Sequence, residues 1–100
     1  MSWQKSIGKA LREIRFVVSN LSQSDSPSAQ FIRKNYTPIK QEHPNFPFIV
    51  RECQGVDDFV VFQYDFGVER KQLLRGLGVQ DIEQLVEKHV AQAKTINSTL

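Results

Sequence analysis

Residues 46–53, Phe46-Pro47-Phe48-Ile49-Val50-Arg51-Glu52-Cys53, form a short apolar run that ends in an arginine–glutamate pair. The two prolines before the run, Pro44 and Pro47, oppose helix formation. A short apolar run bounded by turn residues is typical of a strand that is buried on both faces. Such a strand needs a neighbour on each side, so we expect Phe48–Cys53 to lie in the middle of a sheet. The rest of the chain is expected to pack around it.

A second strand and a helix precede this run. Leu11–Ser19 begins with alternating polar and apolar residues and ends as an apolar run, which predicts a largely buried strand. Ser26 and Pro27 then supply an N-cap and a first helical residue, and apolar residues follow at helical spacing. Pro38 lies inside that pattern and is expected to kink the helix or to end it near Thr37. Strand, helix and strand form a βαβ unit with parallel strands and a right-handed crossover.

Two more strands and a last helix follow. Phe59–Tyr64 is β-branched and aromatic, and we expect it to pair antiparallel with Phe48–Cys53. Glu69–Leu74 is more polar, which predicts an antiparallel edge strand. The last helix is expected to begin near Val79, and its apolar face would hold Val79, Ile82, Leu85, Val86, Val90 and Ala93. The order β-α-β-β-β-α predicts an α/β fold of the thioredoxin-like kind, with a mixed four-stranded sheet and helices on both faces.

The composition is that of one soluble globular domain over residues 1–100, with 40% hydrophobic and 24% charged residues. A formal net charge of +2 is too weak to indicate a nucleic-acid partner. No stretch approaches the length that crosses a bilayer. The single cysteine cannot form an internal disulfide, which favours a reducing compartment.

Both ends of the chain are expected to be loose. Residues 1–10 carry two lysines and no acid, and a helix there would place on one face Trp3, Ile7 and Leu11. A basic amphipathic segment of this kind is typical of a mitochondrial import signal, and a flexible N-terminal segment is the alternative. We expect no cleavable presequence, because the first strand begins almost at once. Residues 95–100 are expected to be a loose tail.

No pattern of catalytic or metal-binding residues is evident. Thiol oxidoreductases of this architecture place Cys-x-x-Cys at the start of the first long helix, but residues 20–30 contain no cysteine. Cys53 has no second cysteine to pair with, and we interpret it as a small buried hydrophobic residue. The spacing of His43, Cys53 and His89 is not that of metal ligands, and we interpret His89 as a half-buried packing residue. We therefore expect no metal and no cofactor, and the sequence favours a redox-inactive module that works by binding.

Several motifs carry a family resemblance. In order they are Leu11-Arg12-Glu13-Ile14-Arg15, Phe31-Ile32 with Tyr36, Pro44-x-x-Pro47, Ile49-Val50-Arg51-Glu52-Cys53 and Tyr64-x-Phe66-Gly67. Their order and spacing resemble the small thioredoxin-like accessory subunit of mitochondrial respiratory complex I (NADH:ubiquinone oxidoreductase), a family shared with certain mitochondrial ribosomal proteins. The resemblance runs from about Leu11 to Val90. Members often have a second cysteine where this chain has Ser19, which excludes a disulfide to Cys53, and a proline where it has Asp58.

The resemblance implies a non-catalytic accessory subunit of the peripheral arm of complex I, on the matrix side of the mitochondrial inner membrane. It implies a hetero-oligomer that docks against the large iron–sulfur subunit and other subunits of that arm, supports assembly and stability, and has no active site of its own. It implies neither nucleic-acid binding nor direct membrane insertion. One alternative is a mitochondrial ribosomal protein of the related family, which would bind rRNA and protein. The other is a divergent thiol oxidoreductase, which the missing Cys-x-x-Cys opposes.

Three arginines are candidates for partner contact. Arg51 ends the expected central strand, at the edge where a thioredoxin-like fold presents loops to its partners. Arg12 and Arg15 lie toward the start of the first strand, so the three need not form one patch. The alternative for Arg51 is an internal ion pair with Glu52, Glu13 or Asp58.

Overall fold

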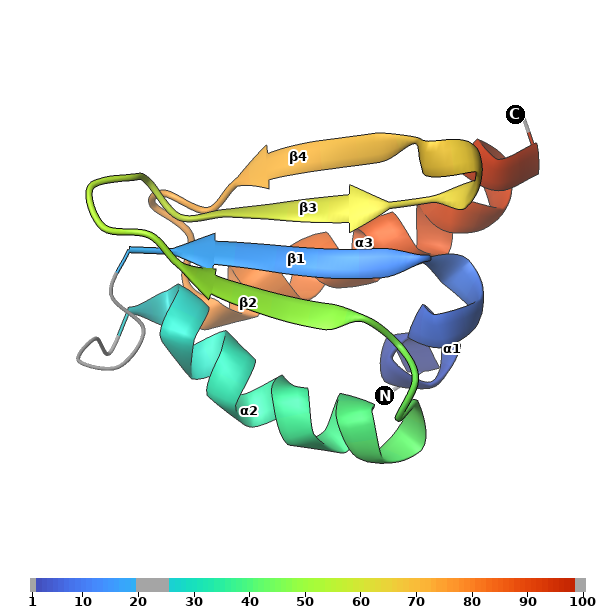
Figure 1. Cartoon of the computed structure of the whole chain (residues 1–100), viewed down its shortest axis with the longest axis horizontal. Coiled ribbons are helices and arrows are strands. Elements are labelled where there is room, and N and C mark those ends of the chain that lie inside the picture. The colour runs from blue at the N-terminus through green and yellow to red at the C-terminus, as the bar shows by residue number, and fades with distance from the viewer. Residues whose placement is uncertain (1, 20–25, 99–100) are drawn as a thin grey trace.

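The computed structural model describes residues 2–19 and 26–98 of the chain. In chain order its elements are α1 (Ser2–Ala10), β1 (Glu13–Val18), α2 (Pro27–Glu42), β2 (Phe48–Glu52), β3 (Phe59–Gln63), a 3₁₀ turn η1 (Asp65–Gly67), β4 (Glu69–Leu73) and α3 (Val79–Ser98). The strands form one mixed sheet in the order β2-β1-β3-β4, and the helices pack beside it (Figure 1). The predicted α/β fold class with a mixed four-stranded sheet is confirmed.

The inner strands of the sheet are β1 and β3, whereas β2 lies at an edge (Figure 1). β1 pairs parallel with β2, as predicted, and antiparallel with β3. The predicted pairing of β3 with β2 is therefore wrong. The apolar run suggested a central strand, but an edge strand can also shield its three apolar residues. Phe48 is buried and Val50 packs against the core, whereas Ile49 lies half-buried on the other face, opposite Arg15.

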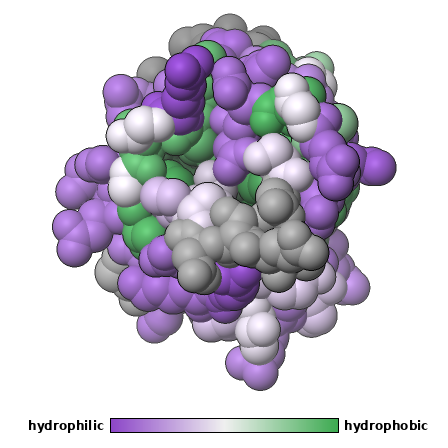
Figure 2. Space-filling view, turned by 90° about the vertical axis from the view of Figure 1, so that its left-hand side faces the viewer, coloured by the Kyte–Doolittle hydropathy of each residue, from purple (hydrophilic) through white to green (hydrophobic). Residues whose placement is uncertain are grey.

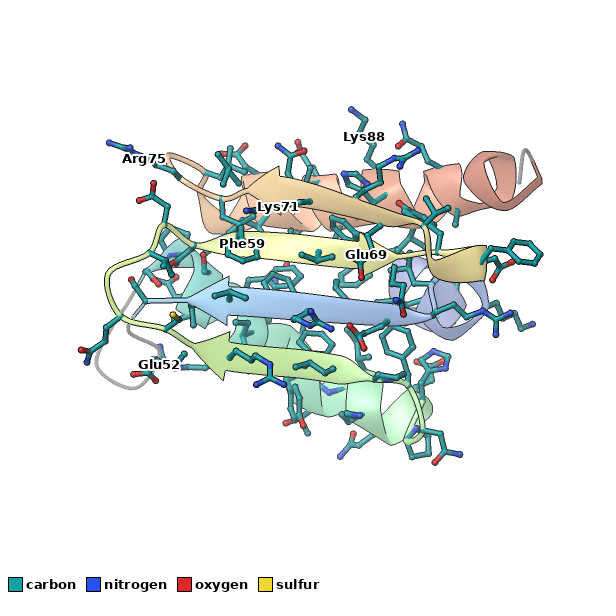
Figure 3. All side chains as sticks on the ribbon, turned by 45° about the horizontal axis from the view of Figure 1, so that its top comes forward. Glu52, Phe59, Glu69, Lys71, Arg75 and Lys88 are labelled. Atoms are coloured by element: carbon teal, nitrogen blue, oxygen red, sulfur yellow. The ribbon has the colours of Figure 1, made fainter. Side chains whose placement is uncertain are left out.

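All three helices pack on one face of the sheet. Trp3 of α1 stacks on Phe31 of α2 with ring centroids 6.2 Å apart, and Phe31 meets Phe16 of β1 at 5.4 Å. On α3, His89 stacks on Phe62 of β3 at 4.1 Å. Since Phe16 and Phe62 belong to the same face of the sheet, as the register requires, the prediction of helices on both faces is wrong. No helix of the described residues covers the opposite face (Figure 3).

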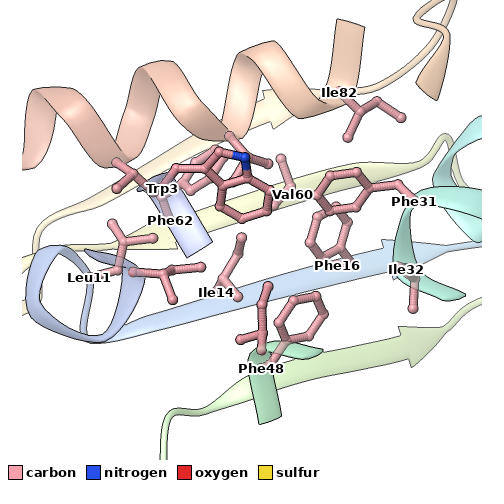
Figure 4. Close-up of a cluster of buried hydrophobic side chains, with 14 of the residues drawn as sticks. Trp3, Leu11, Ile14, Phe16, Phe31, Ile32, Phe48, Val60, Phe62 and Ile82 are labelled. Atoms are coloured by element: carbon pink, nitrogen blue, oxygen red, sulfur yellow. The ribbon is translucent and has the colours of Figure 1, made fainter. Parts of the chain in front are cut away.

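The N-terminal residues form helix α1. Trp3, Ile7 and Leu11 are 3%, 0% and 2% exposed, and they join the core between the sheet and α3 (Figure 4). The expected shared face of these residues is thus confirmed. The expectation of a flexible segment over residues 1–10 is wrong for Ser2–Ala10, because three large apolar side chains anchor it. Helix α3 runs to Ser98, so the tail expected to be loose is helical over 95–98, and residues 99–100 lie outside the described residues.

Local signals place the boundaries of the longer helices. The hydroxyl of Ser26 accepts a hydrogen bond from the backbone N–H of Ala29 at 3.3 Å, and Pro27 is the first helical residue, as predicted. α2 nevertheless continues through Pro38 to Glu42, so the predicted end near Thr37 is wrong. Pro38 is exposed, so the carbonyl that loses its helical partner lies on the solvent side, where water satisfies it. α3 begins at Val79 as predicted, with its buried face made of Ile82, Val86, Val90 and Ala93.

Candidate docking surface

The face of the sheet opposite the helices, called here the open face, carries alternate residues of all four strands. They are Ile49 and Arg51 of β2; Glu13, Arg15 and Val17 of β1; Phe59, Val61 and Gln63 of β3; and Glu69, Lys71 and Leu73 of β4. Strand alternation puts these residues on one face because their neighbours point into the core. Five of these eleven side chains are apolar, and one of them, Leu73, is 54% exposed. An uncovered sheet face that mixes apolar and charged side chains is a candidate for contact with another protein.

The charged side chains of the open face differ in how they are paired. The Nζ of Lys71 on β4 lies 4.2 Å from the centre of the Phe59 ring on β3, a cation–π contact between neighbouring strands (Figure 3). The Nη2 of Arg15 donates to Oε2 of Glu13 at 2.7 Å. Arg51 is exposed, and none of the described residues forms an ion pair or a hydrogen bond with its guanidinium. Arg51 is therefore the cation of this face that is free to meet a partner.

The three arginines predicted as contact residues do not form one patch. Arg15 and Arg51 share the open face, where the register sets Arg15 opposite Ile49 and Arg51 opposite Val17. Arg12 lies near the η1 turn, where its Nε donates to Oδ1 of Asp65 at 2.7 Å. The internal ion pair considered for Arg51 is absent among the described residues. Arg51 also ends an edge strand instead of the central strand that we expected.

Phe66, in the η1 turn, is an exposed aromatic residue that the sequence analysis placed in the Tyr64-x-Phe66-Gly67 motif without naming it as a contact candidate. Its side chain is 86% exposed, and its backbone adopts φ 62° and ψ 26°. This left-handed conformation is costly for a residue with a Cβ atom, and Asn, Asp or Gly usually occupies it. A large apolar side chain held out to solvent on a strained turn is typical of a contact residue. The sequence signal was the aromatic residue directly before Gly67, but φ cannot be inferred from it.

A depression of about 560 Å³ lies at the end of the sheet where β1 stops and α2 begins. Figure 2 views this end of the molecule, where apolar residues lie between polar ones. The backbone N–H of Ser19 donates to Oδ1 of Asp58 at 2.9 Å, and Nη1 of Arg75 lies 3.8 Å from Oδ2 of Asp57. These contacts hold the β2–β3 loop against the end of β1. None of the described residues that line the depression is a cysteine.

Cys53 is exposed just beyond β2, so the interpretation of it as a buried hydrophobic residue is wrong. It lies at the end of an edge strand, where little chain covers it, and its backbone N–H donates to the carbonyl of Val18 at 2.8 Å. Carrying the register one step beyond Val18 and Glu52 sets Ser19 opposite Cys53. A serine there removes the thiol that would stand next to Cys53.

His89 is a half-buried packing residue, as predicted. The hydroxyl of Tyr64 donates to the carbonyl oxygen of His89 at 3.1 Å, and Nδ1 of His89 lies 3.1 Å from the same hydroxyl. Burial lowers the pKa of His89, and the positive charges of Lys88 and Arg70 lower it further. Burial raises the pKa of Tyr64 to about 12, while Arg70 opposes the shift. Stacked on Phe62 and hydrogen-bonded to Tyr64, His89 fastens α3 to β3.

Among the described residues, 2–19 and 26–98, no group of three or more His, Cys, Asp or Glu side chains is placed to hold a metal ion. Nor is any helix there long and apolar enough to span a bilayer.

Comparison with known proteins identifies the family. Residues 30–78 match the family described as "Mitochondrial ribosomal protein L51 / S25 / CI-B8 domain". The chain is 36% identical over 95 residues to NADH dehydrogenase [ubiquinone] 1 alpha subcomplex subunit 2 of Arabidopsis thaliana, which covers 95% of this chain and 98% of that protein. The chain belongs to the alpha subcomplex subunit 2 family of respiratory complex I. The resemblance inferred from its motifs is confirmed.

Two further relatives support membership of the complex I alpha subcomplex subunit 2 family. The NADH-ubiquinone oxidoreductase 10.5 kDa subunit of Neurospora crassa is 31% identical over 90% of this chain and 96% of its own length. Subunit 2 of the mouse, Mus musculus, is 31% identical over 77% of this chain and 78% of its own. The domain match over residues 30–78 contains Arg51 and Phe66, whereas Arg12 and Arg15 precede it.

Proposed function

We propose that this chain is an accessory subunit of mitochondrial respiratory complex I and that it acts by binding, without an active site of its own. The observation that carries the proposal is the 36% identity to a complex I subunit along 95% of this chain and 98% of the relative. Similarity that extends over nearly the whole of both chains includes the surfaces as well as the core. The relatives come from a plant, a fungus and an animal, and each is named as a subunit of the same enzyme.

The finer part of the proposal is the place and role of the subunit. We place it on the peripheral arm, on the matrix side of the inner membrane, docked against the large iron–sulfur subunit, where it supports assembly and stability. This placement follows the family resemblance. The open face supports it, since this face combines apolar side chains with the unpaired Arg51, and a guanidinium at such a site can form a forked pair with a carboxylate of the partner.

A role in the mitochondrial ribosome is the second candidate. The description of the domain matched by residues 30–78 names ribosomal proteins alongside the complex I protein. The 13 basic and 11 acidic residues of the chain nearly balance, which disfavours strong phosphate binding. The longer matches to complex I subunits favour the first candidate.

The test is a native-gel separation of mitochondria from cells in which a tagged copy of the chain replaces the endogenous protein. We expect the tag to migrate with NADH dehydrogenase activity, and loss of the protein to lower the amount of assembled complex I. Migration with ribosomal particles would favour the second candidate, and migration with neither would refute both. Separating the peripheral arm from the membrane arm would then test the placement, because the tag should follow the peripheral arm.

A further inference from the structure

The two edges of the sheet have opposite character. All five residues of β4, Glu69-Arg70-Lys71-Gln72-Leu73, are exposed and mostly charged, whereas β2, Phe48-Ile49-Val50-Arg51-Glu52, is apolar for three of its five. Proteins guard exposed strand edges with charge because the unpaired N–H and C=O groups invite another strand. β4 has this protection and β2 lacks it along most of its length. The unguarded edge is the one beside α2 (Figure 1).

The pairing of β2 with β1 determines which backbone groups point outward. The carbonyl of Pro47 accepts a hydrogen bond from the N–H of Ile14 at 3.1 Å, and the N–H of Cys53 donates to the carbonyl of Val18 at 2.8 Å. The backbone groups of the odd-numbered residues from Pro47 to Cys53 therefore point toward β1. Alternate residues of a strand bond to the same side, so the groups that point away from β1 belong to Phe48, Val50 and Glu52. Phe48 is only 4% exposed, which leaves Val50 and Glu52 as the accessible positions.

A shallow apolar groove accompanies this edge on the helix side. It has a volume of about 290 Å³ and is lined by Ile32, Tyr36, Phe48 and Val50. Tyr36 is 39% exposed and meets the Phe48 ring edge-on, with centroids 5.3 Å apart. A strand laid beside β2 would turn alternate side chains into this groove and onto the open face beside Ile49 and Arg51.

We propose that the free edge of β2 accepts an extended segment of another complex I subunit, which adds a fifth strand to the sheet. The segment would pair with the backbone of Val50 and Glu52, place an apolar side chain against Tyr36, and carry an acidic side chain beside Arg51. The acid follows from charge complementarity, since no described residue neutralises Arg51. This inference rests on the proposed function and specifies the mode of contact with the partner.

A second copy of this chain is a poor occupant of the same edge. Two β2 strands that pair antiparallel through the accessible groups of Val50 and Glu52 would be centred on Arg51. Each Arg51 would then lie opposite its own copy, at a position where the strands hold side chains closest. Like charges directly opposite one another destabilise a sheet. The edge therefore favours a segment that places an acidic side chain opposite Arg51.

Amide hydrogen exchange of the free chain and of the chain within assembled complex I tests the inference directly. In the free chain the amides of Val50 and Glu52 should exchange fast, and in the complex they should slow by about tenfold or more. The register leaves Glu69, Lys71 and Leu73 of β4 with outward N–H groups, and their rates should stay nearly the same. Unchanged exchange over residues 48–52 would overturn the inference. Protection of the free chain that increases with protein concentration would also overturn it, because such protection indicates pairing between two copies of this chain.

A proline substitution at this edge tests the inference by retention. Val50→Pro removes an outward N–H without breaking a bond to β1. We expect Val50→Pro to lower the amount of protein that migrates with complex I several-fold, while the isolated chain still melts cooperatively. Retention of Val50→Pro equal to that of the unsubstituted chain would overturn the inference while the proposed function stands, because the unsubstituted chain still migrates with the complex. If Val50→Pro does not fold, the exchange measurement decides.

Discussion

Arg51 lies directly opposite Val17 in the parallel register of β2 and β1. Its guanidinium therefore projects from the edge of the open face beside an apolar neighbour and without an acid among the described residues. An exposed arginine with no partner stabilises its own fold very little. This exposure leaves its guanidinium available to pair with a carboxylate of a partner.

We expect Arg51→Ala to leave the melting temperature of the isolated chain within about 3 °C of the original, because an exposed unpaired side chain changes stability by about 0.5 kcal/mol or less. The same substitution should lower retention in complex I. Arg51→Lys should restore only part of the loss, since an ammonium cannot form the forked pair. Thermal melts and native gels measure the two effects. A loss of stability in the isolated chain that matches the loss of retention would refute docking through Arg51.

Phe66 offers a test in which stability and assembly should change in opposite directions. Asparagine tolerates the left-handed backbone better than phenylalanine, and the 86% exposed ring contributes almost nothing to the core. We therefore expect Phe66→Asn to stabilise the isolated chain by about 1 kcal/mol and to lower retention in complex I. Phe66→Tyr, which keeps the aromatic ring, is the control. Full retention of Phe66→Asn would show that the strained turn serves no contact.

Local signals in the sequence predicted the four strands and the starts of α2 and α3, but they missed α1, the end of α2 and the neighbours of the strands. Ser26 and Pro27 fix the start of α2 through a cap and a preset φ, and the spacing of apolar residues fixes the buried face of α3. The position of β2 in the sheet depends on which strands pair with it. An apolar run of three residues does not specify this pairing. Ile49 is an example: it is half-buried on the open face, yet an apolar residue at this position is equally compatible with full burial in a central strand.

The candidate surface was predictable only in part for the same reason. Arg51 was found from its position after an apolar run, but its lack of a partner depends on the register that sets Val17 opposite it. The edge groove depends on Tyr36, which stands far from Val50 in sequence and comes close only through the packing of α2 on β2. Phe66 depends on a single backbone torsion. These features come from tertiary contacts and turn geometry.

His89 gives the fold a pH dependence whose direction is fixed by its lowered pKa. The unfolded chain takes up a proton near the ordinary histidine pKa of about 6.5, whereas the folded chain takes it up only at lower pH. Stability is therefore fully present above that value and is lost as pH falls toward the folded pKa. Denaturant melts between pH 7.5 and 5.5 should show a steeper fall for the original chain than for His89→Gln, which cannot titrate. Parallel curves would show that another group dominates.

The last prediction concerns Trp3, which fixes α1 to the rest of the fold. It is 3% exposed and stacked on Phe31, yet its indole N–H is buried without a hydrogen-bond partner among the described residues. Trp3→Ala should lower the free energy of unfolding by about 3–5 kcal/mol, because it leaves a large cavity. Trp3→Phe keeps an aromatic ring against Phe31 and removes the unsatisfied donor, so it should cost much less.

Guanidinium melts followed by circular dichroism measure both variants, and the single tryptophan of the original chain gives a second probe. Its fluorescence should be blue-shifted in the folded chain and should move to longer wavelength in the same transition that the circular dichroism reports. A tryptophan signal of solvent-exposed character in the folded chain, together with equal stability of Trp3→Ala and the original, would show that α1 does not hold the core. The expectation of a flexible N-terminal segment would then be restored, and the helix would contribute nothing to the stability of the subunit.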